Sequence, residues 1–418
     1  MNKNEHQWRT RYYNHLFERF FQFIIPPGAS VLEISVGIQE LKRQEKFDFV
    51  LLPNVIGSLD DVQKCFEELH RVVDEQSRVI ITSYNHLWSG VLRLLEWLRL
   101  KTAQPNQNWL SSQDVVNLLS LARFEIVKRG AFILFPIYVP IASSFLNKYL
   151  ARLPLIRHLC LVNYFVARPC FNHYSDKEYT VSVIIPARNE AGNIENAITR
   201  LPRLGSRTEI IFVEGGSRDN TRDDIFRVIE KYKDKKDIIF VNQGGGKGKG
   251  DAVRKGFARA TGDILMILDA DLTVQPEDLP KFYQAIRTRQ GEFIMGTRLV
   301  YPMEKDAMRF LNIIGNKFFS LAFSWLLEQP IKDTLCGTKV IFRKDYERLA
   351  QNRSYFGDFD PFGDFDLIFG AAKMNLKIVE IPIRYQARKY GSTNISRFSH
   401  GWLLLKMTVF AARKIKFI

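Results

Sequence analysis

Two aspartates separated by one residue, Asp269 and Asp271, have the type and spacing needed to hold a hard metal ion. They follow the apolar run Asp263–Leu268, and two carboxylates at the end of an extended segment can converge on one cation. A divalent cation bound there would neutralise a diphosphate leaving group. Because D-x-D is common on protein surfaces, its meaning depends on the motifs around it.

A glycine-rich loop precedes this pair and reads G-G-G-K-G-K-G-D from Gly244 to Asp251. It leads into an expected helix, where backbone amides and lysines can approach phosphates, so Lys249 and Gly250 are candidate donor-binding residues. The loop lacks the G-x-x-x-x-G-K spacing, and no Ser or Thr follows either lysine, which argues against a P-loop kinase or ATPase. A flexible turn is the alternative interpretation.

The elements that must position these residues are four apolar, β-branched runs separated by helical stretches. Each run ends in polar or glycine-rich residues, as in V-S-V-I-I-P from Val181, E-I-I-F-V-E-G-G-S, D-I-I-F-V-N-Q and D-I-L-M-I-L-D-A-D. Such strands predict a parallel sheet covered by helices on both faces, with ligands at the carboxyl ends of the strands. The polar clusters fall at those ends.

In this order the motifs of residues 181–400 resemble those of family 2 glycosyltransferases of GT-A fold, a Rossmann-like α/β fold. The likeness is greatest to polyprenyl-phosphate sugar transferases such as dolichyl-phosphate mannose or glucose synthases. V-I-I-P-A-R-N-E corresponds to the nucleotide-binding first strand, V-E-G-G-S-R-D-N-T to V-D-D-G-S-x-D-x-T, and D-A-D to the metal motif. The resemblance implies donor contacts from Pro186, Ala187, Arg188, Glu190, Glu214, Ser217, Asp269 and Ala270, with Mg²⁺ or Mn²⁺ on Asp269 and Asp271.

Three positions depart from that pattern. Glu214 and Gly215 replace the pair of aspartates that contacts base and ribose, which leaves the identity of the nucleotide open. Thr273 stands where close relatives often have Gln, and Asn394 replaces the last Lys of R-x-x-G-x-S-K. Of that last element, only Arg388 is carried over.

Further motifs shared with the family supply the remaining candidate catalytic residues. G-T-R contains Arg298, D-T-L-C-G-T-K begins with Asp333, F-G-D-F-D contains Asp364, and I-V-E-I-P-I precedes Arg388. Arg298 and Arg388, with the metal, would stabilise the departing nucleoside diphosphate while the acceptor attacks the anomeric carbon in line, with inversion. A phosphate acceptor needs no strong base, whereas a hydroxyl acceptor would make Asp333 or Asp364 the base. The alternatives are an Arg298–Asp333 ion pair and helix capping by Asp364 and Asp366.

The charge distribution suggests a membrane-associated partner. The chain carries 60 Lys and Arg against 45 Asp and Glu, and no acidic residue follows Glu380. Phe310–Leu327 and Trp402–Ile418 are rich in aromatic residues and leucine, and the second is also basic, as in helices that lie on an anionic bilayer. Packing into the core is the alternative. We expect a lipid-phosphate acceptor and a cytoplasmic protein, peripheral on the inner face of the cell membrane. The polar N-terminus and the four widely spaced cysteines fit that setting.

Residues 1–172 predict a separate, smaller α/β domain, and the transferase domain spans 178–418. Strands are expected at Ser30–Ile34, Asp48–Leu52 and Ser77–Ile81, and helices at Val62–Val73 and Ser112–Leu121. The uncharged run Gly130–Asn147 contains two prolines, which favours a buried strand and linker over a membrane span.

V-L-E-I-S-V-G-I-Q-E-L, from Val31, resembles the first motif of class I S-adenosylmethionine-dependent methyltransferases. Ser35 and Val36 occupy its glycine-rich loop, and the interval before the next strand is too short for the two βα units of that fold. The resemblance therefore implies a truncated, degenerate domain, and we expect no S-adenosylmethionine to bind.

Two other classes of function compete with a hexosyltransferase. Gly215 and the degenerate first domain would also suit a non-catalytic nucleotide-sugar binder or a scaffold for glycan assembly. A nucleic-acid-binding module is disfavoured because no recognised motif accompanies the basic charge. Donor sugar, acceptor identity and oligomeric state stay open at this level.

Overall fold

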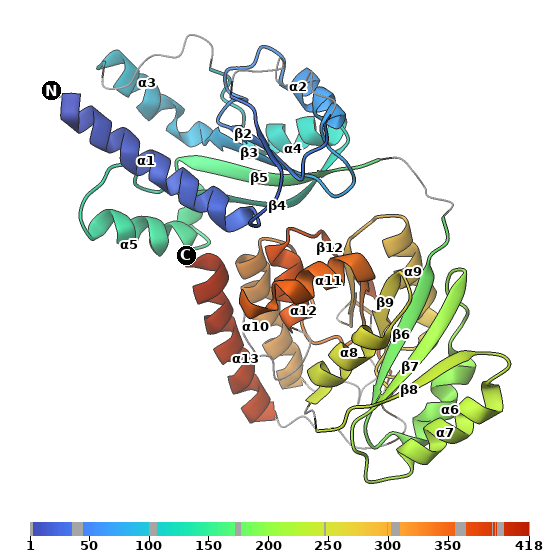
Figure 1. Cartoon of the computed structure of the whole chain (residues 1–418). Coiled ribbons are helices and arrows are strands. Elements are labelled where there is room, and N and C mark those ends of the chain that lie inside the picture. The colour runs from blue at the N-terminus through green and yellow to red at the C-terminus, as the bar shows by residue number, and fades with distance from the viewer. Residues whose placement is uncertain are drawn as a thin grey trace. The chain divides into compact units, whose positions relative to one another are not determined.

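The computed structural model describes residues 3–35, 45–99, 107–171, 177–245, 248–298, 300–301, 310–355, 365–386, 388, 390 and 397–417. The chain divides into two compact units (Figure 1). The N-terminal unit comprises Met1–Asn172 and Ile415–Ile418, and the C-terminal unit comprises His173–Lys414. Within the described ranges, every helix is too short or too polar to span a bilayer.

The N-terminal unit is built on a five-stranded mixed sheet of order β1-β2-β3-β5-β4. Its strands are β1 (Val31–Glu33), β2 (Phe49–Pro53), β3 (Arg78–Tyr84), β4 (Phe124–Phe132) and β5 (Val162–Pro169). β1, β2 and β3 are parallel, and β5 runs antiparallel to both β3 and β4. The sheet and its helices confirm the α/β class expected for this half.

Helices cover both faces of this sheet because each strand alternates apolar side chains between two cores. One core lies under α2 (Val62–Glu68) and α4 (Ser112–Leu121), and the other lies under α1 (Lys3–Ile24) and α3 (Ser89–Trp97). Short segments complete the unit: η2 (Leu69–Arg71), η3 (His86–Trp88), α5 (Ala142–Lys148), η4 (Leu150–Arg152) and η5 (Ile156–Leu159). Ser111 caps α4 in a capping box with Asp114, which explains where that predicted helix begins.

Two features of this unit differ from the sequence expectations. The helix α1 was not anticipated, although it contributes Phe17, Phe20 and Ile24 to the core. The run Gly130–Asn147 was expected to be buried, and its strand portion is buried, as are Ser143 and Asn147, but residues 137–142 are exposed. Apolar side chains also make up much of the accessible surface of folded proteins, so apolar composition alone does not predict burial.

The C-terminal unit contains a seven-stranded sheet of order β12-β10-β11-β9-β6-β7-β8. The strands are β6 (Thr180–Ala187), β7 (Arg207–Glu214), β8 (Asp237–Asn242), β9 (Ile264–Ile267), β10 (Phe293–Thr297), β11 (Lys339–Phe342) and β12 (Ile378–Pro382). The four strands predicted from apolar runs, β6 to β9, are parallel neighbours as expected. The sheet as a whole is mixed, because β11 runs antiparallel to β9 and β10.

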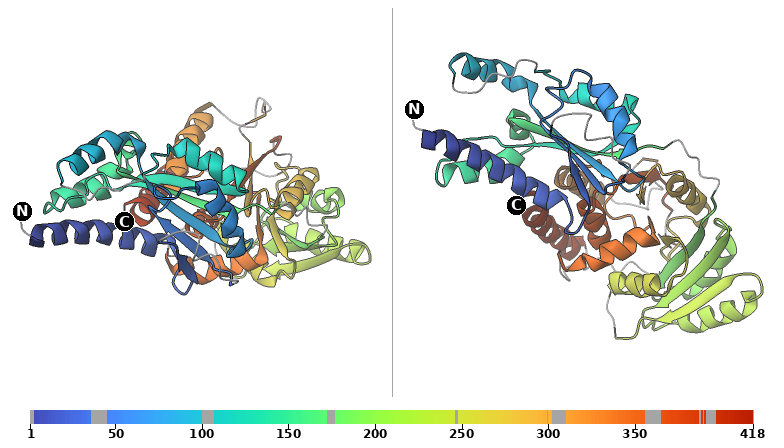
Figure 2. Two further views of the ribbon diagram at one scale, coloured as in Figure 1. Left: turned by 90° about the horizontal axis from the view of Figure 1, so that it is seen from above. Right: turned by 45° about the horizontal axis from the view of Figure 1, so that its top comes forward.

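Helices lie on both faces of this second sheet (Figure 2). One core joins the strands to α6 (Ala191–Arg200), α7 (Thr221–Tyr232) and α9 (Leu279–Arg287), which follows η6 (Pro276–Asp278). α8 (Gly248–Arg259) packs on the opposite face, where Gly256 lies against Ile184 and Val213 so closely that an added Cβ would be 2.5 Å from Ile184. The remaining helices are α10 (Phe310–Leu327), α11 (Arg343–Gln351), η7 (Arg353–Tyr355), α12 (Phe365–Lys373), α13 (Arg397–Ala411) and the π-helical η8 (Ala412–Lys416).

The two segments expected at a lipid surface are helices with two kinds of face. In α10, Phe323, Leu326 and Leu327 are buried, whereas Phe318 and Leu321 are exposed. In α13, Leu404, Met407 and Ala411 are buried, while Trp402 and Val409 face solvent. Both helices therefore contribute to the core and still present apolar side chains outside, so their contact with lipid stays a prediction.

Candidate active site

The chain reverses its direction of travel across the sheet between β6 and β9. It moves from β6 outward through β7 and β8, then returns to place β9 on the other side of β6. The carboxyl ends of the strands on either side of such a reversal form the usual ligand-binding crevice of a parallel α/β sheet. Residues Pro186–Glu190 and Leu268–Asp271 lie at these two ends.

Asp269 forms an ion pair with a lysine from the glycine-rich loop and packs closely against Gly337. Lys249 Nζ lies 2.6 Å from Asp269 Oδ1. Burial raises the pKa of the Asp269 carboxyl, but Lys249, Lys339 and Arg298 outweigh it and leave that pKa below its usual range. A Cβ added to Gly337 would lie only 2.0 Å from Asp269 Oδ2, so only glycine leaves room for this carboxylate.

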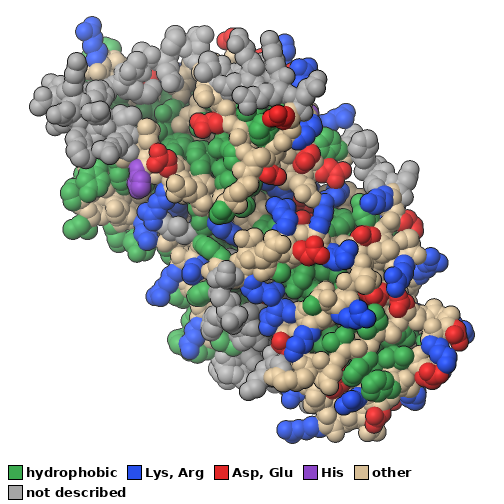
Figure 3. Space-filling view, viewed as in Figure 1, with side chains coloured by type: hydrophobic (Ala, Val, Ile, Leu, Met, Phe, Trp, Pro, Cys, Tyr) green, Lys and Arg blue, Asp and Glu red, His purple; other side chains and the backbone are tan. Residues whose placement is uncertain are grey.

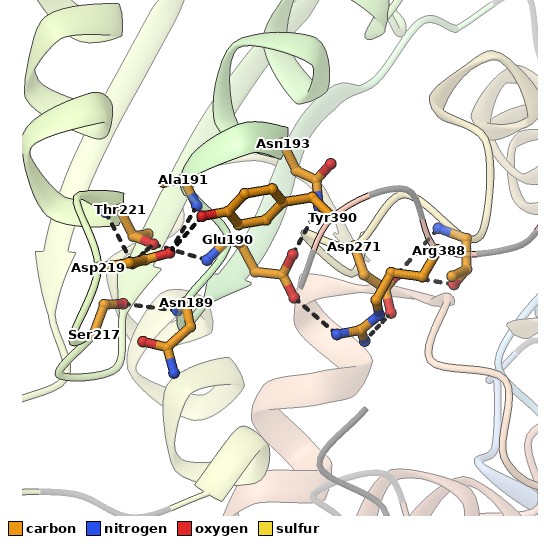
Figure 4. Close-up of polar contacts among 11 residues, drawn as sticks. Asn189, Glu190, Ala191, Asn193, Ser217, Asp219, Thr221, Asp271, Arg388 and Tyr390 are labelled. Atoms are coloured by element: carbon orange, nitrogen blue, oxygen red, sulfur yellow. Dashed lines mark hydrogen bonds and ion pairs between the residues drawn. The ribbon is translucent and has the colours of Figure 1, made fainter. Parts of the chain in front are cut away.

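Asp271 is fixed by its own turn and by Arg388 (Figure 4). Its Oδ1 accepts hydrogen bonds from the backbone N of Thr273 at 3.1 Å and from Thr273 Oγ1 at 2.9 Å. Arg388 Nη2 lies 2.6 Å from Asp271 Oδ2, and Arg388 Nη1 lies 3.3 Å from Glu190 Oε1. The guanidinium therefore bridges the ends of β6 and β9, and Thr273 supports the turn that carries Asp271.

Glu190 is buried at the start of α6. Burial raises the pKa of its carboxyl above the ordinary value, although Asn193 Nδ2, which donates to Glu190 Oε2 at 2.7 Å, and Arg388 act in the opposite direction. The backbone N of Glu190 donates to Thr221 Oγ1 at 2.8 Å. These contacts fix the Glu190 carboxylate next to the Asp271–Arg388 pair.

The loop after β7 is tied to the loop after β6 by a set of local hydrogen bonds (Figure 4). The backbone N of Asn189 donates to Ser217 Oγ at 3.0 Å, and the backbone N of Ala191 donates to Asp219 Oδ2 at 3.3 Å. Tyr390 Oη donates to the same Asp219 oxygen at 3.4 Å. These contacts fix the two loops that the family resemblance assigns to the nucleotide.

Gly215 has no side chain at the end of β7, and Gln243 lies beside the space where one would be. A Cβ added to Gly215 would be 2.9 Å from Gln243 Oε1. The Gln243 amide is held in turn, because its Nε2 donates to Gly248 O at 2.9 Å and to Asp251 Oδ2 at 3.0 Å. Glu214 is buried, and its Oε1 accepts a hydrogen bond from the backbone N of Ser217 at 2.5 Å.

Arg298 and Asp333 form a buried ion pair. Arg298 Nε and Nη2 lie 2.6 and 2.8 Å from the two carboxylate oxygens of Asp333, which is fully buried. Burial raises the pKa of Asp333, but Arg298 and backbone donors outweigh it, so the net pKa is lowered. Tyr385 lies under the guanidinium, 5.1 Å from Arg298 Cζ to the ring centroid. This geometry favours the ion-pair interpretation of the two residues over roles as base and diphosphate ligand.

The other candidate residues fall where their motifs place them. Pro186 and Ala187 end β6, Arg188 follows them and is exposed, Gly250 lies in the first turn of α8, and Ala270 separates the two aspartates. Asp364 lies outside the described residues, as does Asn394. The structure thus brings the ends of β6 and β9, the glycine-rich loop and Arg388 into one site, with Arg298 and Asp333 paired beneath it.

The residues present suit a divalent cation that takes most of its ligands from substrate and water. No group of three or more His, Cys, Asp or Glu able to hold a metal occurs among the residues described. Mg²⁺ typically binds through one or two carboxylates together with substrate phosphates, and Asp269 and Asp271 supply that number. Both side chains are partly exposed, at 27% and 14%, so a ligand can reach them.

Sequence reasoning missed Gly337 and Gln243 as parts of this site. Gly337 lies in D-T-L-C-G-T-K, a motif recognised as shared but given no role beyond its aspartate. Gln243 could have been found from its position, because it follows the last predicted parallel strand and precedes the glycine-rich loop.

The fold is that of an α/β protein with paired carboxylates and cations at the reversal point of a parallel sheet region, and comparison with known proteins gives the family. Residues 182–349 match the family model described as glycosyl transferase family 2. Dolichyl-phosphate beta-glucosyltransferase of Saccharomyces cerevisiae is 30% identical over 236 residues, which cover 51% of this chain and 69% of that protein. The chain belongs to glycosyl transferase family 2.

A second relative and a solved structure extend the comparison. Dolichol-phosphate mannosyltransferase of Pyrococcus furiosus is 35% identical over 51% of this chain and 59% of its own. The solved structure of glucosyl-3-phosphoglycerate synthase from Mycobacterium tuberculosis with Mn²⁺ and uridine diphosphate is 18% identical over 57% of this chain and 80% of its own, with a TM-score of 0.41. The family assignment therefore rests on the sequence matches.

Proposed function

We propose that residues 178–418 form an inverting, metal-dependent hexosyltransferase that takes the sugar from a nucleotide-diphosphate sugar and passes it to a polyprenyl phosphate at a membrane surface. The observation that carries the proposal is the pairing at the reversal point of the sheet, where Lys249 holds Asp269 and Arg388 holds Asp271. Two carboxylates and two cations within reach of each other complement a metal ion and a diphosphate, respectively.

In this mechanism Asp269 and Asp271 would hold a divalent cation, which would supply positive charge next to the departing diphosphate. Lys249 and Arg388 can then leave their carboxylates and donate to phosphate oxygens. The Asn189–Ser217 and Ala191–Asp219 hydrogen bonds fix the loops after β6 and β7 before the donor binds. These loops therefore need little rearrangement during the reaction.

A phosphate acceptor fits the described part of the site better than a hydroxyl acceptor. Asp333, one of the two candidate bases, has both carboxylate oxygens engaged by Arg298 and is fully buried. A phosphate is already ionised at neutral pH and requires no base. The relatives named for dolichyl phosphate support the same acceptor class, and a lipid acceptor would place the enzyme on the inner face of the cell membrane.

The N-terminal unit is proposed as a scaffold derived from a methyltransferase-like fold. Its parallel strands β1 and β2 are immediate neighbours and only residues 34–48 lie between them, which is too short for two βα units. Titration calorimetry with S-adenosylmethionine tests this, and binding at micromolar affinity would show that the unit keeps a functional cofactor site.

The transfer reaction is tested by screening UDP-, GDP- and TDP-sugars with Mn²⁺ and a polyprenyl phosphate, read by mass spectrometry. The expected result is a glycosylated lipid phosphate with one donor, and its loss in Asp271→Asn with unchanged thermal unfolding. Donor binding without product from any donor and lipid would instead favour a non-catalytic nucleotide-sugar binder. Full activity of Asp271→Asn would contradict the metal role.

A further inference from the structure

The connection between β4 and β5 in the N-terminal unit is far longer than its geometry requires. Phe132 pairs with Val162 in antiparallel register, and the backbone N of Leu161 donates to Ile133 O at 2.8 Å. The two ends of the connection therefore lie next to each other. About two to five residues suffice to join such strands. Residues 134–160 are used instead, and they form α5, η4 and η5.

This connection is held in a defined conformation. Asn147 Oδ1 accepts hydrogen bonds from the backbone N of Leu134 and of Phe135, each at 2.9 Å, and its Nδ2 donates to Phe135 O at 2.7 Å and to Tyr12 Oη at 3.1 Å. Ala151 and Cys160 are buried beneath it. The outward direction of its apolar side chains is therefore built into the fold.

The connection turns large apolar side chains toward solvent. Ile141 and Leu155 are 87% and 86% exposed. The full set of exposed large hydrophobic residues in this segment is Ile137, Tyr138, Val139, Ile141, Phe145, Tyr149, Leu153, Leu155 and Leu159. Figure 3 shows hydrophobic side chains gathered at the left edge of that view, where Figure 1 places α5.

Helix α3 extends this surface. Asn85 Nδ2 donates to His158 O at 2.8 Å and Trp88 Nε1 donates to Leu159 O at 2.9 Å, which ties the start of α3 to η5. The helix buries Leu92 but exposes apolar residues on its other side, with Trp97 at 78%. The exposed residues are Leu87, Val91, Leu94, Trp97 and Leu98. We call these residues, with those of the connection, the apolar face.

The charges in the apolar face are almost all positive. No acidic residue occurs between Glu125 and Asp176, whereas Lys148, Arg152 and Arg157 lie within the connection. Apolar side chains interleaved with cations suit the surface of an anionic bilayer. A second copy of the chain fits less well, because a twofold contact would bring cations against cations.

We propose that the apolar face binds the surface of an anionic lipid bilayer, with Trp97, Ile141 and Leu155 entering the boundary between headgroups and acyl chains. This site lies in the N-terminal unit, and its edge meets the end of the chain, where the Tyr149 ring lies 5.5 Å from that of Phe417. It does not depend on the transfer reaction.

Cosedimentation of the full chain with vesicles tests the proposal. The wild type should bind phosphatidylcholine vesicles that contain phosphatidylglycerol, and binding should weaken without the anionic lipid and in high salt. The double variant Ile141→Gln/Leu155→Gln should bind at least about tenfold more weakly, because two large apolar side chains no longer leave water. Leu121→Gln is the matched control, since Leu121 is 65% exposed on α4 over the other face of the sheet, and it should bind like wild type.

Tryptophan quenching by brominated lipid locates the contact. Trp97→Phe should reduce the quenching, because Trp97 is 78% exposed in the apolar face. Unchanged quenching in Trp97→Phe, or unchanged vesicle binding of the double variant, would overturn the proposal. Self-association of the wild type without lipid that the double variant abolishes would identify a subunit interface instead. Nucleoside diphosphate binding should be equal in all variants, so failure here is separable from failure of the transferase assignment.

Discussion

The space beside Gly337 gives the most direct test of how the site holds Asp269. A Cβ at this position would be 2.0 Å from Asp269 Oδ2 and 2.5 Å from Lys249 Nζ, whereas real Cβ contacts are essentially never below 3.0 Å. In Gly337→Ala the carboxylate must therefore move by at least 1.0 Å, the difference between 3.0 and 2.0 Å. Asp269 would then no longer lie where the wild type holds it, so its contribution to a metal site shared with Asp271 should weaken.

The expected loss is large for metal binding and small for folding. A displacement of about 1 Å can cost about 100-fold in rate, equivalent to about 2.7 kcal/mol, and a comparable loss of Mn²⁺ affinity should accompany it. Overpacking by one methyl group should lower the free energy of unfolding by about 1–3 kcal/mol. Titration calorimetry with Mn²⁺ in the presence of a nucleoside diphosphate measures the first quantity, and urea unfolding measures the second.

Gly315→Ala is the control for this experiment. Gly315 lies in α10 of the same unit with nothing within 4 Å of an added Cβ, so the same chemical change should leave Mn²⁺ affinity unchanged. If Gly337→Ala bound Mn²⁺ within twofold of wild type, the argument that glycine is required to seat Asp269 would be refuted.

Three further predictions concern the charged groups around the site. Asp333→Asn should lower the free energy of unfolding by about 3–5 kcal/mol in a urea titration, because it leaves Arg298 buried without its counter-ion. As a control, Asp237→Asn breaks the exposed pair with Arg207 and should lower that free energy by less than about 1 kcal/mol. Burial raises the pKa of Glu380 to about 7, so the folded state binds the proton more tightly than the unfolded state. Relative to Glu380→Gln, the wild type should therefore lose up to about 3 kcal/mol of stability as pH rises from about 4.5 to 7, and a flat difference would contradict the assignment. Lys249→Met should weaken nucleoside diphosphate binding about 10- to 100-fold. It should strengthen the binding of Mn²⁺ alone, because Lys249 no longer competes with the metal for Asp269. Weaker Mn²⁺ binding in calorimetry would disprove this competition.

The sequence was sufficient to predict the strands and the site residues that depend only on neighbouring residues in the chain. The strands β6 to β9 were predictable because continuous apolar β-branched runs fit a sheet buried on both faces. Asp269 and Asp271 could be placed at the ligand edge because they follow one of those strands. The antiparallel direction of β11 could not be predicted, since the four residues Lys339–Phe342 carry no signal for chain direction.

Pairings between distant residues required the structure. Arg388 is 117 residues from Asp271 and 198 from Glu190, and nothing in the local pattern around any of them specifies that contact. The Arg298–Asp333 pair was foreseen only as an alternative to separate catalytic roles. The exposure of residues 137–142 was not predicted for a different reason, because an apolar run was assumed to be buried, although apolar side chains are common on protein surfaces.

The charge arrangement of the site implies that metal and nucleotide diphosphate bind together. Asp269, Asp271 and Glu190 share Lys249 and Arg388, so the carboxylates and cations largely neutralise each other. A divalent cation alone would compete with Lys249 and Arg388 for the aspartates. A diphosphate alone would compete with the carboxylates for the same cations. When both ligands bind, the metal takes the place of the two cations beside the aspartates and the diphosphate takes the place of the aspartates beside the cations, so each ligand should raise the affinity for the other by the same factor. Lys249→Met should reduce that factor, because it removes one of the two groups that must change partner.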